Sequence, residues 1–87
     1  KFELNLLQDL PPTEVPADSP LIQTIREATH DVLGREARPT GNSGATVTKQ
    51  LIARGVTAVG FSAGNADLAH MADEYVEIDE LVNFAKV

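Results

Sequence analysis

The stretch Ser43–Ser62, "SGATVTKQLIARGVTAVGFS", decides the expected fold, because its hydrophobic pattern changes at a glycine. Its first half repeats apolar residues at helical spacing, which predicts a helix that begins at Ser43. Gly55 is the residue type that commonly ends a helix. The mostly apolar run Val56–Ser62 then predicts a buried strand. A helix followed by a buried strand indicates an α/β layer.

Two further helices are expected on either side of this stretch. In "SPLIQTIREATHDVLG", Ser19 suits the N-cap, Pro20 suits the first helical position and Gly34 suits the stop. The apolar residues between them recur at steps of three and four, which gives the helix one apolar face. In the last ten residues, "IDELVNFAKV", a similar apolar stripe predicts a helix that begins at Ile78.

The N-terminal part of the chain predicts a strand and a linker. Phe2, Leu4 and Leu6 alternate with polar residues, as in a half-buried strand. The proline-rich stretch "DLPPTEVPADSP" that follows predicts an extended connector between domains. Residues 36–40 could add a short edge strand, because Pro39 excludes a central one. Two or three strands cannot cover three helices, so we expect a piece of a larger α/β protein, or a chain that oligomerises.

Composition excludes several classes of protein. The formal charge of -6 and the scattered basic residues argue against nucleic acid or an anionic membrane as a partner. The absence of cysteine excludes disulfides and thiolate chemistry, and it fits a cytoplasmic protein. No apolar run approaches the roughly 20 residues that a membrane helix needs.

Chemistry-bearing residues gather in the last third of the chain. His70 follows the predicted buried strand, where open α/β sheets place their ligands, and Asp73 and Glu74 are close enough in sequence to orient it. A solvated or structural histidine is the alternative. Gly60-Phe-Ser62-Ala-Gly64 matches the pattern of a nucleophile elbow, with a tight turn at the end of a strand as the alternative.

Residues 40–46 also allow two interpretations, and His30 has a structural one. The stretch "TGNSGAT", residues 40–46, could bind an anion through its backbone N–H groups, or Ser43 could simply cap the following helix. His30 is expected to be a partly exposed residue of the first helix.

The stretches "TGNSGATVTKQLIARGVTAVGFSAG" and "AHMADEYVEIDELVNF" together resemble a known family. It comprises dinuclear zinc amidohydrolases and exopeptidases, including succinyl-diaminopimelate desuccinylase, acetylornithine deacetylase, aminoacylase and carboxypeptidase G. Ala69-His70-x-x-Asp73-Glu74 carries the more specific part of the resemblance. The resemblance implies a fragment of a mixed-sheet α/β catalytic domain at residues 20–87. Residues 1–10 would be the last strand of an inserted lid domain, and residues 11–19 the linker.

The resemblance also implies roles for individual residues. His70 would be a ligand to one of two zinc ions, with cobalt or manganese as alternative metals, and Asp73 and Glu74 would hold its loop through the backbone or the ring. The predicted substrate-binding residues come from two turns: Asn42, Ser43, Gly44, Gly60, Ser62, Ala63 and Gly64. The implied substrate is an N-acyl amino acid or a short peptide. The implied protein partners are the rest of the same chain and a second copy in a homodimer.

The sequence also departs from the family pattern. The Asp and Arg that often follow the glycine-rich turn are absent after Gly41, which leaves the substrate open. The other metal ligands and the general base would lie upstream, so the 87 residues alone are expected to be inactive. The competing hypothesis is a small, non-enzymatic α/β module for interaction or dimerisation.

Overall fold

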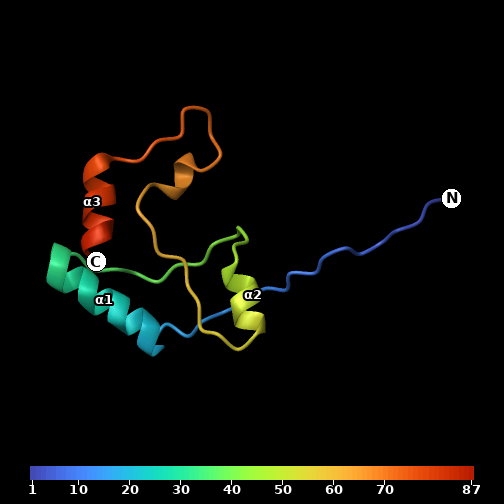
Figure 1. The fold of residues 1–87 in the computed structure, drawn as a ribbon, viewed down its shortest axis with the longest axis horizontal. Coiled ribbons are helices and arrows are strands. Elements are labelled where there is room, and N and C mark those ends of the chain that lie inside the picture. Colours follow the sequence, from blue (N-terminus) through green and yellow to red (C-terminus); the bar gives the residue numbers. More distant parts are fainter.

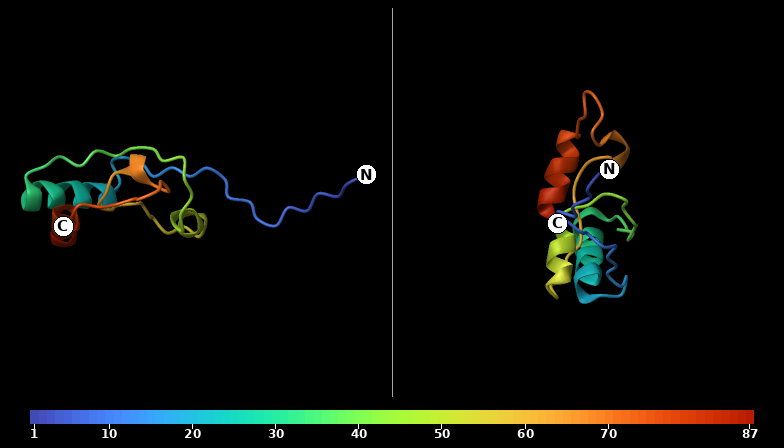
Figure 2. Two further views of the ribbon diagram at one scale, coloured as in Figure 1. Left: turned by 90° about the horizontal axis from the view of Figure 1, so that it is seen from above. Right: turned by 90° about the vertical axis from the view of Figure 1, so that its right-hand side faces the viewer.

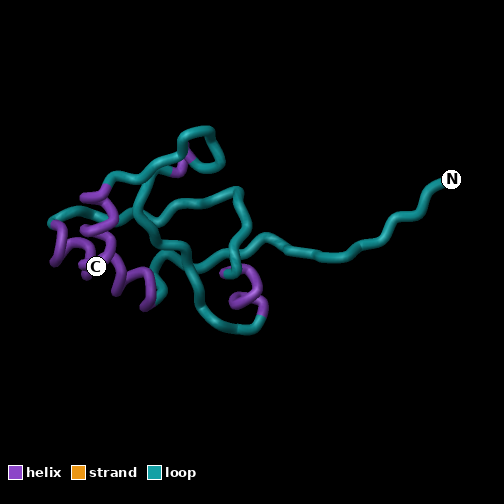
Figure 3. The backbone as a smooth tube through the Cα atoms, turned by 45° about the horizontal axis from the view of Figure 1, so that its top comes forward, coloured by secondary structure: helices purple, strands orange, loops and turns teal.

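The structure, a computed structural model, describes residues 1–87 and is built from helices and irregular segments (Figure 1). In chain order the helices are α1 at Pro20–Leu33, α2 at Thr48–Ala53, the short 3₁₀ helix η1 at Ala66–Leu68, and α3 at Ile78–Lys86. No residue is in a β-strand, and loops connect all four helices (Figure 3). None of the helices has the length and apolar content that crossing a membrane requires.

α1 has the ends that the sequence predicts. The Ser19 side chain accepts a hydrogen bond from the Ile22 N–H at 3.5 Å, and Pro20 occupies the first turn. At the other end Gly34 adopts a left-handed φ of 64°, and its N–H donates to the His30 carbonyl at 2.9 Å. The predicted helix, with both of its boundaries, is therefore confirmed.

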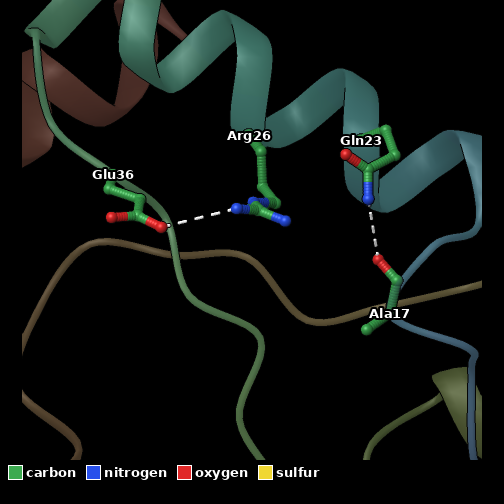
Figure 4. A network of polar contacts seen from close by, with 4 residues as sticks. All are labelled: Ala17, Gln23, Arg26 and Glu36. Atoms are coloured by element: carbon green, nitrogen blue, oxygen red, sulfur yellow. Dashed lines mark hydrogen bonds and ion pairs between the residues drawn. The ribbon is translucent and has the colours of Figure 1, made fainter.

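Polar side chains also tie α1 to the segments on either side of it (Figure 4). The Gln23 side-chain amide donates to the Ala17 carbonyl at 3.0 Å. Arg26 forms an ion pair with Glu36 at 3.4 Å. These contacts are solvent-exposed, so each contributes only a few tenths of a kcal/mol by the usual order of magnitude.

α2 is shorter than the predicted helix. It begins at Thr48 rather than Ser43, so the predicted start was wrong. The Asn42 side chain accepts from the Gly44 N–H at 2.7 Å, and the Thr46 hydroxyl accepts from the Thr48 N–H at 3.3 Å. Such side-chain bonds offer the backbone an alternative to the helix, so the residues before Thr48 remain in turns. The predicted start of α3 at Ile78 is confirmed.

The three segments expected to be strands are irregular in this structure. Residues 2–6, 36–40 and 56–62 have no ladder partner, and residues 57–62 make no backbone–backbone hydrogen bond. The physical reason is that a strand satisfies its N–H and C=O groups only through a neighbouring strand. These strands are therefore not formed within the chain, and the larger mixed-sheet domain stays a prediction.

The molecule has almost no core of its own. Thr29, on α1, is the single buried residue. No two helices pack along a shared face, and the contacts between residues far apart in the sequence are isolated. The Phe61 and Phe84 rings lie 5.2 Å apart between centroids, and Arg35 pairs with Glu80 on α3 at 3.5 Å.

Size measurements agree with this open packing. The radius of gyration is 16.4 Å, whereas a compact domain of this length has about 12 Å. The accessible surface is 7625 Å², against about 5,000 Å² for a compact protein of this mass. The N-terminal arm, residues 1–10, extends away from the body of the molecule (Figure 1 and the left panel of Figure 2). The arm exposes Phe2, Leu4, Leu6 and Leu7 almost completely.

Candidate functional site

His70 lies in a loop that contains η1 and precedes α3, and the two ends of this loop approach each other. Gly64 begins this loop with a φ of 100°, a conformation that favours glycine. A Cβ at Gly64 would lie 3.7 Å from a Val76 methyl group, so the entry and the exit of the loop are in contact distance. Compact surface loops with close ends often carry function. We define the His70 loop as residues 64–76.

η1 is built into the first half of the His70 loop. The Asn65 side chain accepts from the Asp67 N–H at 2.9 Å and so caps this short helix. The Met71 N–H donates to the Leu68 carbonyl at 3.1 Å, which continues the turn beyond η1. His70 is therefore presented by a hydrogen-bonded turn, although residues 69–71 of this turn are exposed.

The backbone at His70 is unusual. His70 has a φ of 63° and Asp73 has a φ of 57°, and these are the two non-glycine residues with positive φ in the molecule. The left-handed region is uncommon for residues with a Cβ, although Asp and His enter it more often than most. The Glu74 carboxylate accepts a hydrogen bond from the His70 N–H at 3.2 Å, across the turn that these residues form.

The imidazole of His70 is free of internal partners. Its ring nitrogens make no hydrogen bond and no ion pair within the chain, and the residue is exposed. A neutral imidazole of this kind is a suitable zinc donor. No three metal-ligating side chains lie together anywhere in the structure. Zinc sites use three or four protein ligands, so these residues do not form a complete zinc site, and the role of His70 as a ligand stays a prediction.

The predicted substrate-binding residues lie in two other segments. Asn42, Ser43 and Gly44 form an exposed turn before α2, closed by the bond between the Asn42 side chain and the Gly44 N–H. Gly60, Ser62, Ala63 and Gly64 lie in the irregular segment that leads into the His70 loop. The hydrogen bonds of each segment are local, and none joins these turns to His70 or Glu74. Their assignment to a substrate cleft stays a prediction.

The alternative roles of the glycine-rich motifs find no support in the geometry. A nucleophile elbow needs a serine hydroxyl bonded to a histidine at a turn between a strand and a helix. Ser62 makes no hydrogen bond to His70 and follows no strand. Ser43 does not cap α2, whose N-cap is Val47 without any side-chain bond. His30 is an exposed residue of α1 beside Asp31, as expected.

An open pocket of about 310 Å³ lies beside the His70 loop. Residues from the base of the loop and the start of α3 line it: Gly64, Asn65, Leu68, Tyr75, Val76, Glu77 and Glu80. His70 is not among these lining residues. The pocket therefore offers no site that includes the candidate metal ligand.

Comparison with known proteins identifies the family. The sequence matches Peptidase family M20/M25/M40 over residues 1–87. The chain belongs to this family. It is also 38% identical over 82 residues to the Bacillus subtilis (strain 168) protein named "Putative dipeptidase YtjP". No solved structure matches the chain.

Membership of the M20/M25/M40 family confirms the resemblance that the sequence suggested. The match covers 94% of the chain but 18% of the length of the Bacillus subtilis relative. The chain therefore corresponds to a small part of a protein of that size.

The left-handed backbone of His70 was not foreseen from the sequence. Glycine usually marks positions with positive φ, and neither His70 nor Asp73 is glycine. The residue types give only a weak signal, since Asp and His tolerate this region better than branched residues do. The left-handed conformation of His70 is consequently a feature that sequence reasoning could not single out. The implied bond from Glu74 is present at the backbone N–H of His70, whereas the Asp73 side chain makes no hydrogen bond.

Proposed function

We propose that the chain is the C-terminal portion of a zinc-dependent hydrolase of amide or peptide bonds. His70 is the residue of this chain that would bind the metal. The substrate of the hydrolase would be an N-acyl amino acid or a short peptide. The observation that carries the proposal is the free, exposed imidazole on a hydrogen-bonded loop in a member of a peptidase family. The name of the Bacillus subtilis relative favours dipeptides among these substrates.

The proposal assigns a role to each part of the chain. The His70 loop would present one nitrogen donor to a metal ion. Bound zinc supplies Lewis-acid polarisation of a carbonyl and a lowered pKa for its water. The Asn42–Gly44 turn and the Gly60–Gly64 segment would border the substrate once the missing parts of the domain cover them. A general base outside these residues would accept the proton of the attacking water. The chain by itself would therefore be inactive.

The experiment replaces His70 in the complete protein that carries this sequence. His70→Ala should remove most of the hydrolysis of dipeptides and N-acyl amino acids, and part of the bound zinc. His30→Ala is the matched control, because His30 is an exposed histidine on α1. Normal zinc content and a normal rate in His70→Ala would refute the proposal.

A second experiment separates the enzyme from the rival interaction module. A non-enzymatic module would fold cooperatively by itself, whereas the near absence of buried residues leaves the chain little to fold around. Chemical denaturation of the 87 residues alone should therefore show no sharp transition, and zinc should produce no turnover. A cooperative transition without metal would favour the module instead.

A further inference from the structure

The His70 loop contains two backbone positions that need external support. Left-handed residues with a Cβ are disfavoured, and they persist where the surrounding structure holds them. His70 and Asp73 are both in this state, three residues apart, in a loop without buried side chains. Packing cannot supply the support, so a specific polar contact must supply it.

The contact that spans these two positions comes from Glu74. Its carboxylate oxygen accepts from the backbone N–H of His70 at 3.2 Å, which closes a turn of five residues. The Asp73 side chain makes no hydrogen bond in the structure, so the two neighbouring acids differ in what they do. Asp73 contributes a backbone conformation, and Glu74 contributes an acceptor.

The way in which Glu74 acts also leaves the imidazole unoccupied. A carboxylate that receives the ring N–H of a histidine fixes its tautomer and raises its basicity. Here the carboxylate receives the backbone N–H, and both ring nitrogens remain without a partner in the chain. One nitrogen is thus available to a metal and the other to a partner from outside these residues.

We propose that Glu74 is a positioning residue that fixes the backbone of His70 and does not act on the imidazole. The proposal rests on the proposed function in one respect, namely that His70 is a metal ligand. It predicts that a neutral acceptor at position 74 is sufficient, because a backbone N–H needs an acceptor and not a charge. A group that oriented the ring by its charge would require the carboxylate itself.

The experiment compares two substitutions of similar length in the complete protein. Glu74→Gln keeps a carbonyl oxygen that can accept from the His70 N–H, whereas Glu74→Met removes every acceptor. Zinc affinity, measured by competition with a chelator, is the readout. Glu74→Met should weaken zinc binding by about 10- to 100-fold, the range found when partners of metal ligands are removed. Glu74→Gln should keep most of the affinity.

Asp73 provides a second test that does not depend on Glu74. Asp73→Gly allows a φ of 57° without a Cβ penalty, so zinc affinity should be retained. Asp73→Val places a branched side chain in the left-handed region and should lower the affinity. Asp67→Ala is the control, because Asp67 is an exposed acid of η1 whose side chain makes no hydrogen bond.

The outcomes distinguish the two proposals. If Glu74→Gln is as weak as Glu74→Met, or if Glu74→Met binds zinc normally, the role of Glu74 is overturned while that of His70 stands. If His70→Ala binds zinc normally in the same assay, the proposed function fails first. The positioning role of Glu74 would be supported if zinc affinity is lost in Glu74→Met and retained in both Glu74→Gln and Asp73→Gly.

Discussion

α1 and the segment Val56–Ser62 are both rich in apolar side chains, yet only α1 has regular structure in this chain. The backbone of α1 is satisfied within the helix and at its two caps. In the second segment, Val56 donates to the Leu51 carbonyl, and residues 57–62 make no backbone–backbone bond. The difference shows that a helix carries its partners with it, whereas a strand depends on residues elsewhere.

The largest expected effect comes from placing proline in each region. Ala28→Pro removes a hydrogen bond in the middle of α1 and creates a clash, at a cost of about 3 kcal/mol or more. Helical signal at 222 nm in circular dichroism and the Cα chemical shifts of α1 should collapse in the 87-residue chain.

Val59→Pro places proline in the segment Val56–Ser62, where the opposite result is expected for the 87-residue chain. Val59 donates no backbone hydrogen bond in this chain, so the substitution should leave the spectra nearly unchanged. In the complete protein it should lower the free energy of unfolding by about 1–3 kcal/mol, the cost of an unmade buried bond. An unchanged stability of the complete protein would mean that this segment is not a central strand there.

The sequence predicted those elements whose signals are local. The sequence predicts both ends of α1, because Ser19, Pro20 and Gly34 fix the helix ends through contacts with residues close to them in the sequence. The start of α2 was missed because Asn42 and Thr46 form competing bonds that hydrophobic spacing does not reveal. The strands stay predictions, because a strand needs a neighbouring strand and none forms among these residues.

The candidate site shows the same contrast between features that local sequence predicts and features that it does not. The motif around His70 led to the right family, because its residue types and spacing are specific. A contact from Glu74 to the backbone or the ring of His70 was among the implied roles, and the structure shows it at the backbone N–H. The left-handed backbone of His70 depends on three-dimensional geometry that its residue type does not reveal. The role of His70 as a metal ligand stays a prediction, because the chain brings no three metal-ligating side chains together.

The next effect concerns the C-terminal end of α1. Gly34→Ala introduces a Cβ at a φ of 64°, which should cost about 1–2 kcal/mol and fray the last turn of the helix. Amide hydrogen exchange near His30 would measure the fraying. Gly41→Ala is the matched control, because Gly41 has open space around it and no positive φ. Equal exchange in both variants would contradict the capping role of Gly34.

A smaller effect is expected at the other end of α1. Ser19→Ala removes the side-chain acceptor of the Ile22 N–H and should destabilise the first turn by about 0.5–1 kcal/mol. The low part of the known range applies because the bond is long, at 3.5 Å. Ser19→Asp should preserve the helix, since aspartate caps as well as serine does. The chemical shifts of residues 20–23 would report either change, and a loss in the aspartate variant would argue against capping.

The smallest effect is a gain, and it tests whether local signals alone can strengthen a helix in this chain. Glu77 is the N-cap of α3 and has the extended backbone of a cap, but its side chain caps nothing. Glu77→Ser would supply a short acceptor for the free N–H groups of the first turn. Glu80 lies three residues later and could bond back to residue 77, which completes a capping box. The helical content of α3 should rise by the equivalent of a few tenths of a kcal/mol.

An existing contact of Glu80 makes this substitution informative. Glu80 already pairs with Arg35 at 3.5 Å, so the new bond competes with an exposed ion pair of small value. Arg35→Ala in combination with Glu77→Ser should therefore leave the gain intact or enlarge it. If the gain disappears in the double variant, the order of α3 depends on its tether to the end of α1. α3 would then resemble Val56–Ser62, whose structure depends on partners, more than it resembles α1.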